Sequence, residues 1–174
     1  MRAECNVEGN LFNLQAFKTI NGTQRTGSVQ VKQAGSLGTD VLAHFSSYPD
    51  TQSAVFYINT DNNRLIVLDP FSYLKASNGY TDSPLPAGGE LKFTFYNDTS
   101  RPEPYKWPVF GIYEEERYLT VDGNVNAFGY CAEDEGNSVL TGSIVVGDDA
   151  INAEGCAPLD GLMVYPVTTQ LAIE

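Results

Sequence analysis

The sequence predicts one all-β domain, built as a single antiparallel β-barrel or sandwich of short strands. Three observations predict this class: 16 Gly and 9 Pro mark many turns, 10 Tyr and 9 Phe are of types enriched in strands, and only 18% of the residues are charged. No segment carries a sustained helical stripe. A length of 174 residues suits one domain over 1–174, in which we expect residues 1–10 to fray.

The N-terminal part supplies the first expected strands. The segment "LFNLQAFKTI" at 11–20 alternates, with Phe12, Leu14 and Ala16 on one face, and the Asn-Gly pair that follows it is a strong turn signal. Further strands are expected at 28–32 and 40–45.

Two segments in the middle of the chain fit one template. They are "VFYINTDNNRLIV" at 55–67 and "VFGIYEEERYLTV" at 109–121, and both read V-F-x-I, six residues, then L-x-V. Apolar residues flank a polar tip in each, so we predict two hairpins whose register is fixed by the apolar residues. Because the tips differ completely, the repeat is expected to be scaffold and not a shared catalytic site. In the first copy the register-fixing residues are Val55, Ile58, Leu65 and Val67.

Repeated hairpins also occur in the three-lobed β-trefoil, which is the alternative architecture. The segment at 12–31 would then be a degraded third copy. In the remaining chain we expect a Pro- and Gly-rich loop at 78–89, an alternating strand at 91–96 with Thr94 on its wet face, and a proline-rich connection at 97–108. Other strands are expected at 71–76, 126–131, 139–146 and 161–167.

The charge balance excludes two classes of partner. Ten basic and 22 acidic residues give a net charge of −12, so the molecule repels polyanions. Nucleic acid and anionic lipid surfaces bind through basic residues, and neither is expected here. No run of about 18 apolar residues exists, so we also expect no membrane insertion.

Catalytic and metal-binding residues are scarce. His44 is the single histidine, no G-x-S-x-G motif is present, and we expect neither a cofactor nor a metal site. Paired carboxylates leave a small glycosidase open, because that chemistry needs only two acids across a cleft. The candidates are Glu90, Glu103, the run 114–116 and the acidic stretch 148–154, each of which also reads as a solvated surface.

Aromatic side chains offer a binding function instead. Pyranose rings dock against flat apolar groups, and four aromatic residues lie close together in the sequence around the second hairpin. Tyrosines that face solvent from a strand without any ligand are the alternative interpretation. The candidate glycan-contact residues are Tyr105, Trp107, Tyr113 and Tyr118.

The three cysteines fit neither a zinc site nor a C-x-x-C redox pair, so one disulfide and one leftover thiol is the simplest account. Cys5, Cys131 and Cys156 leave the pairing open. Two N-glycosylation sequons begin at Asn21 and Asn97, both in expected turns, and they suit a secreted protein.

Several phrases together resemble fungal secreted cell-wall proteins of the PhiA type, with the related IgE-binding antigens and hypersensitive-response elicitors. They are "SAVFYINTDNNRLIVLD" at 53–69, "FGIYEEERYLTVDG" at 110–123, and the cysteine-containing "GYCAEDEGNSVL" and "GCAPLDGLMVYPV". The resemblance implies a small all-β protein without a catalytic centre. It also implies that Cys131 pairs with Cys156, and it leaves the partner of Cys5 open.

The expected function is therefore that of a secreted, non-enzymatic fungal protein at the cell wall or in the host apoplast, perceived by plants as an elicitor. A cell-wall glycan or a host surface protein would be its partner. The alternative function is that of a carbohydrate-active protein, either a glycan-binding module or a small glycosidase that uses two carboxylates. The sequence specifies neither the ligand nor the oligomeric state.

Overall fold

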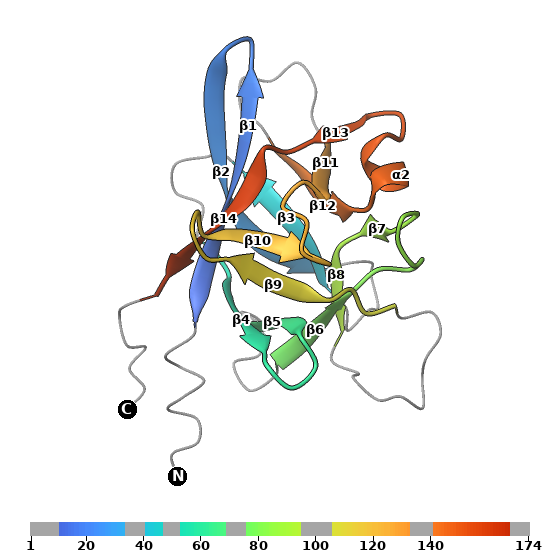
Figure 1. The fold of residues 1–174 in the computed structure, drawn as a ribbon. Coiled ribbons are helices and arrows are strands. Elements are labelled where there is room, and N and C mark those ends of the chain that lie inside the picture. Colours follow the sequence, from blue (N-terminus) through green and yellow to red (C-terminus); the bar gives the residue numbers. More distant parts are fainter. Residues whose placement is uncertain are drawn as a thin grey trace.

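The computed structural model describes residues 11–33, 41–46, 53–68, 76–94, 106–132 and 141–167. These residues confirm the all-β class, since nearly every element is a strand and every pairing is antiparallel (Figure 1). The first strands are β1 (Phe12–Ile20), β2 (Thr23–Gln33), β3 (Val41–Ser46), β4 (Val55–Asn59), β5 (Arg64–Leu68), β6 (Ala76–Tyr80), β7 (Gly89–Glu90) and β8 (Lys92–Thr94). The others are β9 (Phe110–Tyr113), β10 (Tyr118–Val121), β11 (Phe128–Ala132), β12 (Thr141–Val146), the short helix α2 (Asp148–Ile151), β13 (Cys156–Pro158) and β14 (Gly161–Pro166).

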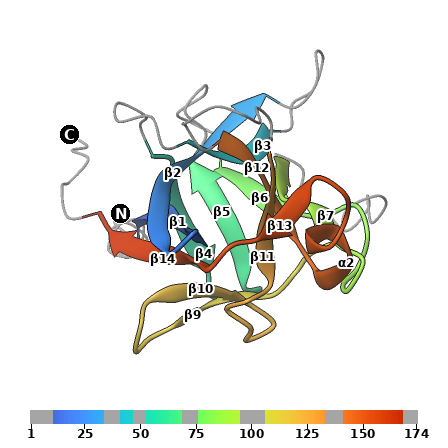
Figure 2. The same cartoon turned by 90° about the horizontal axis from the view of Figure 1, so that it is seen from above.

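The strands follow the order β13-β11-β12-β3-β8-β6-β5-β4-β1-β14-β10-β9, with β2 bridging β1 and β3 and β7 on the side of β12. The strand pairing of β4 with β1 consists of one residue pair, Phe12 with Phe56. The sheet is therefore not closed into a barrel, and its strands fold over one another as in a sandwich. Figure 2 shows β9 and β10 at one side of the molecule, next to β14 and β1, and α2 at another side with β7 and β13.

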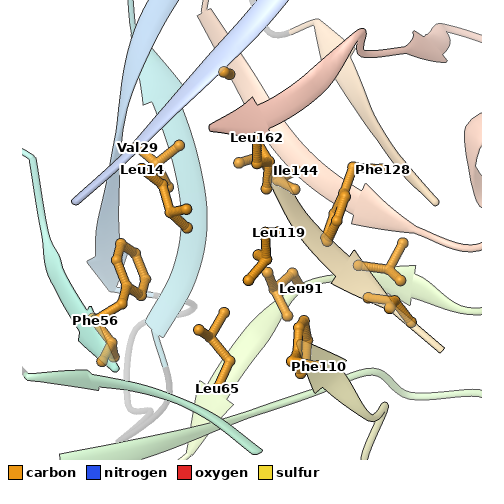
Figure 3. Packing of buried hydrophobic residues seen from close by; sticks show 14 of the residues in the cluster. Leu14, Val29, Phe56, Leu65, Leu91, Phe110, Leu119, Phe128, Ile144 and Leu162 are labelled. Carbon is orange, nitrogen blue, oxygen red and sulfur yellow. The ribbon is translucent and has the colours of Figure 1, made fainter. Parts of the chain in front are cut away.

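The core lies where the inward faces of these strands meet. Alternation buries Phe12, Leu14 and Ala16 on β1, as the sequence predicts. Side chains from distant parts of the chain converge on them, as Figure 3 shows for Phe56, Leu65, Leu91, Phe110, Leu119, Phe128, Ile144 and Leu162.

The long β1–β2 hairpin turns at Asn21 and Gly22, which have φ of 53° and 80°. Positive φ at both central residues is the geometry that an Asn-Gly turn provides, and it matches the right-handed twist of the strands. This two-residue turn differs from the four-residue turns of the two template hairpins. Residues 12–31 are thus not a third copy of the template, and the trefoil alternative finds no support in them.

Both template hairpins form as predicted, β4–β5 from the first segment and β9–β10 from the second. One detail of the prediction is wrong. Phe56, and not Val55, shares the inward face with Ile58, because Phe56 pairs with Val67 and Ile58 pairs with Leu65.

The structure corrects two further expectations and adds two short elements. The loop expected at 78–89 contains the end of β6 and the start of β7, since Asn78 and Tyr80 pair with β8. Thr94, expected on a wet face, is fully buried, because the sheet is covered on both sides at this point. The stretch from 148 to 158 contains α2 and β13, elements too short to give a periodic signal in the sequence.

Candidate functional site

A row of side chains crosses the outer face of the sheet from β9 to β2. Tyr113 pairs with Tyr118, Tyr118 with Met163, Met163 with Gln15, and Gln15 with Ser28. Residues directly opposite one another on neighbouring strands point to the same side of a sheet. We call these five residues the tyrosine row.

Alternation along each strand explains why the tyrosine row faces outward. The neighbours of its members in the sequence point the other way, and Leu14, Leu119 and Leu162 are fully buried in the core. Tyr113 retains 44% of its accessible surface, whereas Tyr118 and Met163 are half-buried. The row therefore offers aromatic and thioether surface to solvent on a rigid, core-backed sheet.

A second row lies beside the first. Tyr165 is two residues beyond Met163 on β14, so it faces the same side, and it pairs with Asn13 of β1. Its exposed fraction is 43%. Tyr165 and Asn13 extend the aromatic and polar surface along the strand direction.

Gly161 provides the space in which the ring of Tyr118 lies. A Cβ atom built on Gly161 would come within 2.8 Å of Cε1 and 2.9 Å of Cδ1 of that ring. Such distances are far below ordinary carbon contact, so any larger residue at 161 would displace the ring. The glycine thus lets the Tyr118 ring lie close against the backbone of β14.

The polar side chains of this face are held by internal hydrogen bonds. Asn13 Nδ2 donates to the carbonyl oxygen of Ala54 at 2.9 Å, and Gln15 Nε2 donates to Ser28 Oγ at 3.0 Å. Each amide is therefore fixed in orientation and keeps its carbonyl oxygen as an acceptor. A depression of about 400 Å³ is lined by Asn13, Gln15, Phe17, Thr26, Ser53 and Tyr165.

A separate groove of about 410 Å³ lies between the two template hairpins. Its walls include Ile58 and Asn63 of the first hairpin and Phe110 and Ile112 of the second. The described lining contains one carboxylate, Glu114, near Arg117. Hydrolysis by a carboxylate mechanism uses two acids on opposite sides of the substrate, and the described walls of this groove offer one.

The other carboxylate candidates lie on different elements. Glu90 is exposed in β7, Asp148 and Asp149 form the first turn of α2, and Glu154 is exposed in the turn before β13. Within the described ranges, no three His, Cys, Asp or Glu side chains are grouped as metal ligands would be. Glu103 lies outside the described residues.

Trp107 packs against two side chains of the protein itself. The guanidinium of Arg64 sits 3.9 Å from the centre of its ring, a cation–π geometry, and the ring of Tyr80 meets it edge-on at 6.2 Å. Burial lowers the pKa of the Arg64 guanidinium from its ordinary value. Trp107 thus packs against β5 and β6 and does not belong to the tyrosine row.

The four predicted glycan-contact residues therefore separate. The structure brings Tyr113 and Tyr118 together as direct cross-strand neighbours and assigns Trp107 to the contact with Arg64, while Tyr105 lies outside the described residues. Sequence reasoning missed Met163 and Tyr165. The signal was present in "GLMVYPV", where period-2 alternation puts Gly161, Met163 and Tyr165 on one face.

The predicted pairing of Cys131 with Cys156 is confirmed. Cys131 of β11 and Cys156 of β13 are direct cross-strand partners and form a disulfide that closes a sequence separation of 25. Cys5 lies outside the described residues. Asn21 is exposed at the tip of the β1–β2 hairpin, where its glycosylation stays a prediction, and Asn97 also lies outside the described residues.

The remaining predictions concern His44 and the membrane. His44 occupies β3, with its backbone paired to Gln30 of β2 and Ser143 of β12. In the part of the chain that the structure describes, no helix has the length and apolar character needed to span a bilayer.

Comparisons with family models, with curated proteins and with solved structures found no match to this chain.

Proposed function

We propose that this chain is a secreted, non-enzymatic protein that acts at the cell wall by holding polysaccharide on its outer sheet face. The tyrosine row carries the proposal. Its rings and thioether lie in line on a rigid sheet, and amides fixed by internal bonds stand beside them. Flat apolar surface flanked by oriented hydrogen-bonding groups is what a sugar ring needs, because its faces are apolar and its edge carries hydroxyls.

Two further observations support secretion and a non-enzymatic role. A disulfide such as Cys131–Cys156 persists in oxidising compartments and is rare in the cytosol, which favours secretion. The described walls of the hairpin groove supply one carboxylate, Glu114, where a glycosidase would use two. The sequence resemblance favours a filamentous fungus as the source. It also favours a role as an elicitor, a protein that a plant host perceives.

Co-sedimentation with insoluble wall polysaccharides tests the proposal, combined with an assay for released reducing sugar. We expect the protein to bind without releasing sugar. Tyr113→Ala with Tyr118→Ala should weaken binding at least tenfold, whereas Val109→Ala, which removes an equally exposed apolar side chain away from the row, should bind normally. Sugar release above background would replace the proposal with the glycosidase alternative, and absence of binding to any wall fraction would refute it.

A further inference from the structure

The side chains that make up the tyrosine row are uncharged. The row consists of Tyr, Met, Gln and Ser side chains, and the adjacent depression is lined by Asn, Gln, Phe, Thr, Ser and Tyr. No Asp, Glu, Lys or Arg is among these residues, although the whole chain carries a net charge of −12. Two carboxylates reach its margins. Tyr113 Oη donates to Glu115 Oε1 at 3.3 Å at one end of the row, and Thr19 Oγ1 donates to Asp160 Oδ2 at 2.7 Å beyond the depression.

This distribution selects against charged ligands. A polyanion would be repelled by the acidic molecule and would find no basic side chain on the row to pair with. A polycation would be attracted by the protein as a whole, but among the described side chains it would meet a carboxylate on the row at the Tyr113 end alone, that of Glu115. Ring faces and amide carbonyls suit a ligand that brings apolar ring surface and hydroxyl donors without charge.

The row also has a direction and a length. It runs perpendicular to the strands, from Tyr113 at the β9 edge of the sheet to Ser28 on β2. Four strand spacings separate its ends, a distance of about 19 Å at the usual 4.7–4.9 Å between strands. Gln15 belongs both to the row and to the depression, so the two surfaces are continuous.

We propose, building on the proposed function, that the ligand is an uncharged, linear polysaccharide that lies across the strands along the tyrosine row and enters the depression beside Gln15. Successive sugar units rest on Tyr113, Tyr118 and Met163. The fixed amides of Gln15 and Asn13 accept hydrogen bonds from hydroxyls at the inner end. Gly161 acts as the positioning residue, because it lets the ring of Tyr118 lie flat enough for a sugar chain to pass over it.

The chain-length part of the inference is tested with soluble neutral oligosaccharides, from disaccharides to octasaccharides of β-glucan and of chitin, by isothermal titration calorimetry. Affinity should rise with length until the oligomer spans the row, and then level off. An affinity that is the same for a disaccharide as for longer oligomers would show that one pocket, and not the row, binds the ligand.

The charge part is tested with polygalacturonate and chitosan beside the neutral polymers, at low and at high salt. Neutral polymers should bind with an affinity that changes less than twofold between the two salt concentrations, because no ion pair contributes. Binding to a charged polymer alone, weakened strongly by salt, would overturn the inference and leave the proposed wall function standing. Failure to bind every polysaccharide would overturn both.

Variants locate the bound chain. Gln15→Ala should reduce affinity for long oligomers several-fold, and Gly161→Ala should do the same by lifting the Tyr118 ring. The exposed Val109→Ala should leave affinity unchanged, and thermal melts of all three would confirm that they fold. Unchanged affinity in both Gln15→Ala and Gly161→Ala would contradict the path. A dimer that dissociates when Tyr113 and Tyr118 are replaced would also contradict it, since a second copy of the chain would then cover this face. Analytical ultracentrifugation measures this.

Discussion

The two template hairpins share an inner face and a turn. Their inward residues correspond position by position, and all are fully or almost fully buried: Phe56, Leu65 and Val67 in the first, Phe110, Leu119 and Val121 in the second. Their turns correspond as well. The amide of Asn63 donates to the carbonyl of Asn59 at 2.7 Å, and the amide of Arg117 donates to that of Tyr113 at 2.7 Å. Asn63 and Arg117 both have φ of 59°.

Their outer faces are alike in the middle of the hairpin and differ beside the turn. In the middle, the outward Ile66 of β5, which pairs with β6, is 3% exposed, and the corresponding Thr120 of β10 is 6% exposed. Beside the turn, Asn59 of β4 is half-buried, whereas the corresponding Tyr113, on the last strand β9, is 44% exposed. Beside the turn, the same template therefore gives a partly covered surface in one place and a candidate binding surface in the other, because the position in the sheet decides what covers the outer face.

The largest expected effect tests the shared inner face. Leu65→Ala and Leu119→Ala should each lower the free energy of unfolding by about 2–5 kcal/mol, since each truncates a fully buried aliphatic side chain. Ile58→Ala should cost less, because Ile58 is only partly buried. Urea denaturation of the three variants measures this. If Leu119→Ala were nearly neutral, the second hairpin would not be an equal part of the core.

The disulfide outside both hairpins provides the next test. Replacing Cys131 and Cys156 by alanine should lower the free energy of unfolding by about 3 kcal/mol, mainly because the unfolded chain gains freedom over the closed loop. The loss should appear equally in probes of the two hairpins if the domain unfolds as one unit. Amide hydrogen exchange in both hairpins, with and without the disulfide, measures this loss of stability. Unequal losses would show that the two hairpins unfold as independent units.

The turns give a smaller and reciprocal effect. Arg117 holds a left-handed backbone conformation that asparagine adopts more readily. Arg117→Asn should therefore stabilise the protein by about 0.5–1 kcal/mol, and Asn63→Arg should destabilise it by a similar amount. Thermal melts of both exchanges measure the difference. Effects of the same sign would mean that the two turns are not equivalent.

The alkaline stability of the first hairpin gives the smallest effect. Burial raises the pKa of Tyr57 above its ordinary value of 10.0. The folded state then binds this proton more tightly than the unfolded chain, so the contribution is complete below pH 10 and is lost as the pH rises through the raised pKa. Tyr57→Phe should reduce the loss of stability between about pH 8 and about pH 11. An identical pH profile for the variant would refute this role.

The inward faces of the hairpins could be predicted from the sequence, whereas the exposure of their outward faces could not. Inward residues of the hairpins repeat a pattern with a fixed period, so Leu119 could be assigned to the core directly. Exposure of Tyr113 depends on β9 being the last strand, which local pattern does not encode. The prediction that Thr94 faces solvent was wrong for the same reason, since burial from both sides depends on distant segments.

The candidate site was predictable only in part. Tyr113 and Tyr118 are close in the sequence, but Met163 and Gln15 join them through strand pairing over long separations. Trp107 was grouped with the tyrosines by sequence proximity, but the structure places its ring against Arg64 and not in the tyrosine row. A pairing order for the strands would have been needed to find the row.

Matched positions in the two hairpins allow the most direct test of the central claim, that the second hairpin binds wall polysaccharide while the first serves as scaffold. Tyr118 and Arg64 occupy the same place in the template. Binding of a neutral, insoluble wall polysaccharide should be measured for Tyr118→Ala and Arg64→Ala, with circular dichroism to verify that both are folded. We expect at least a tenfold loss of affinity for Tyr118→Ala and wild-type affinity for Arg64→Ala. Wild-type binding by Tyr118→Ala would contradict the claim.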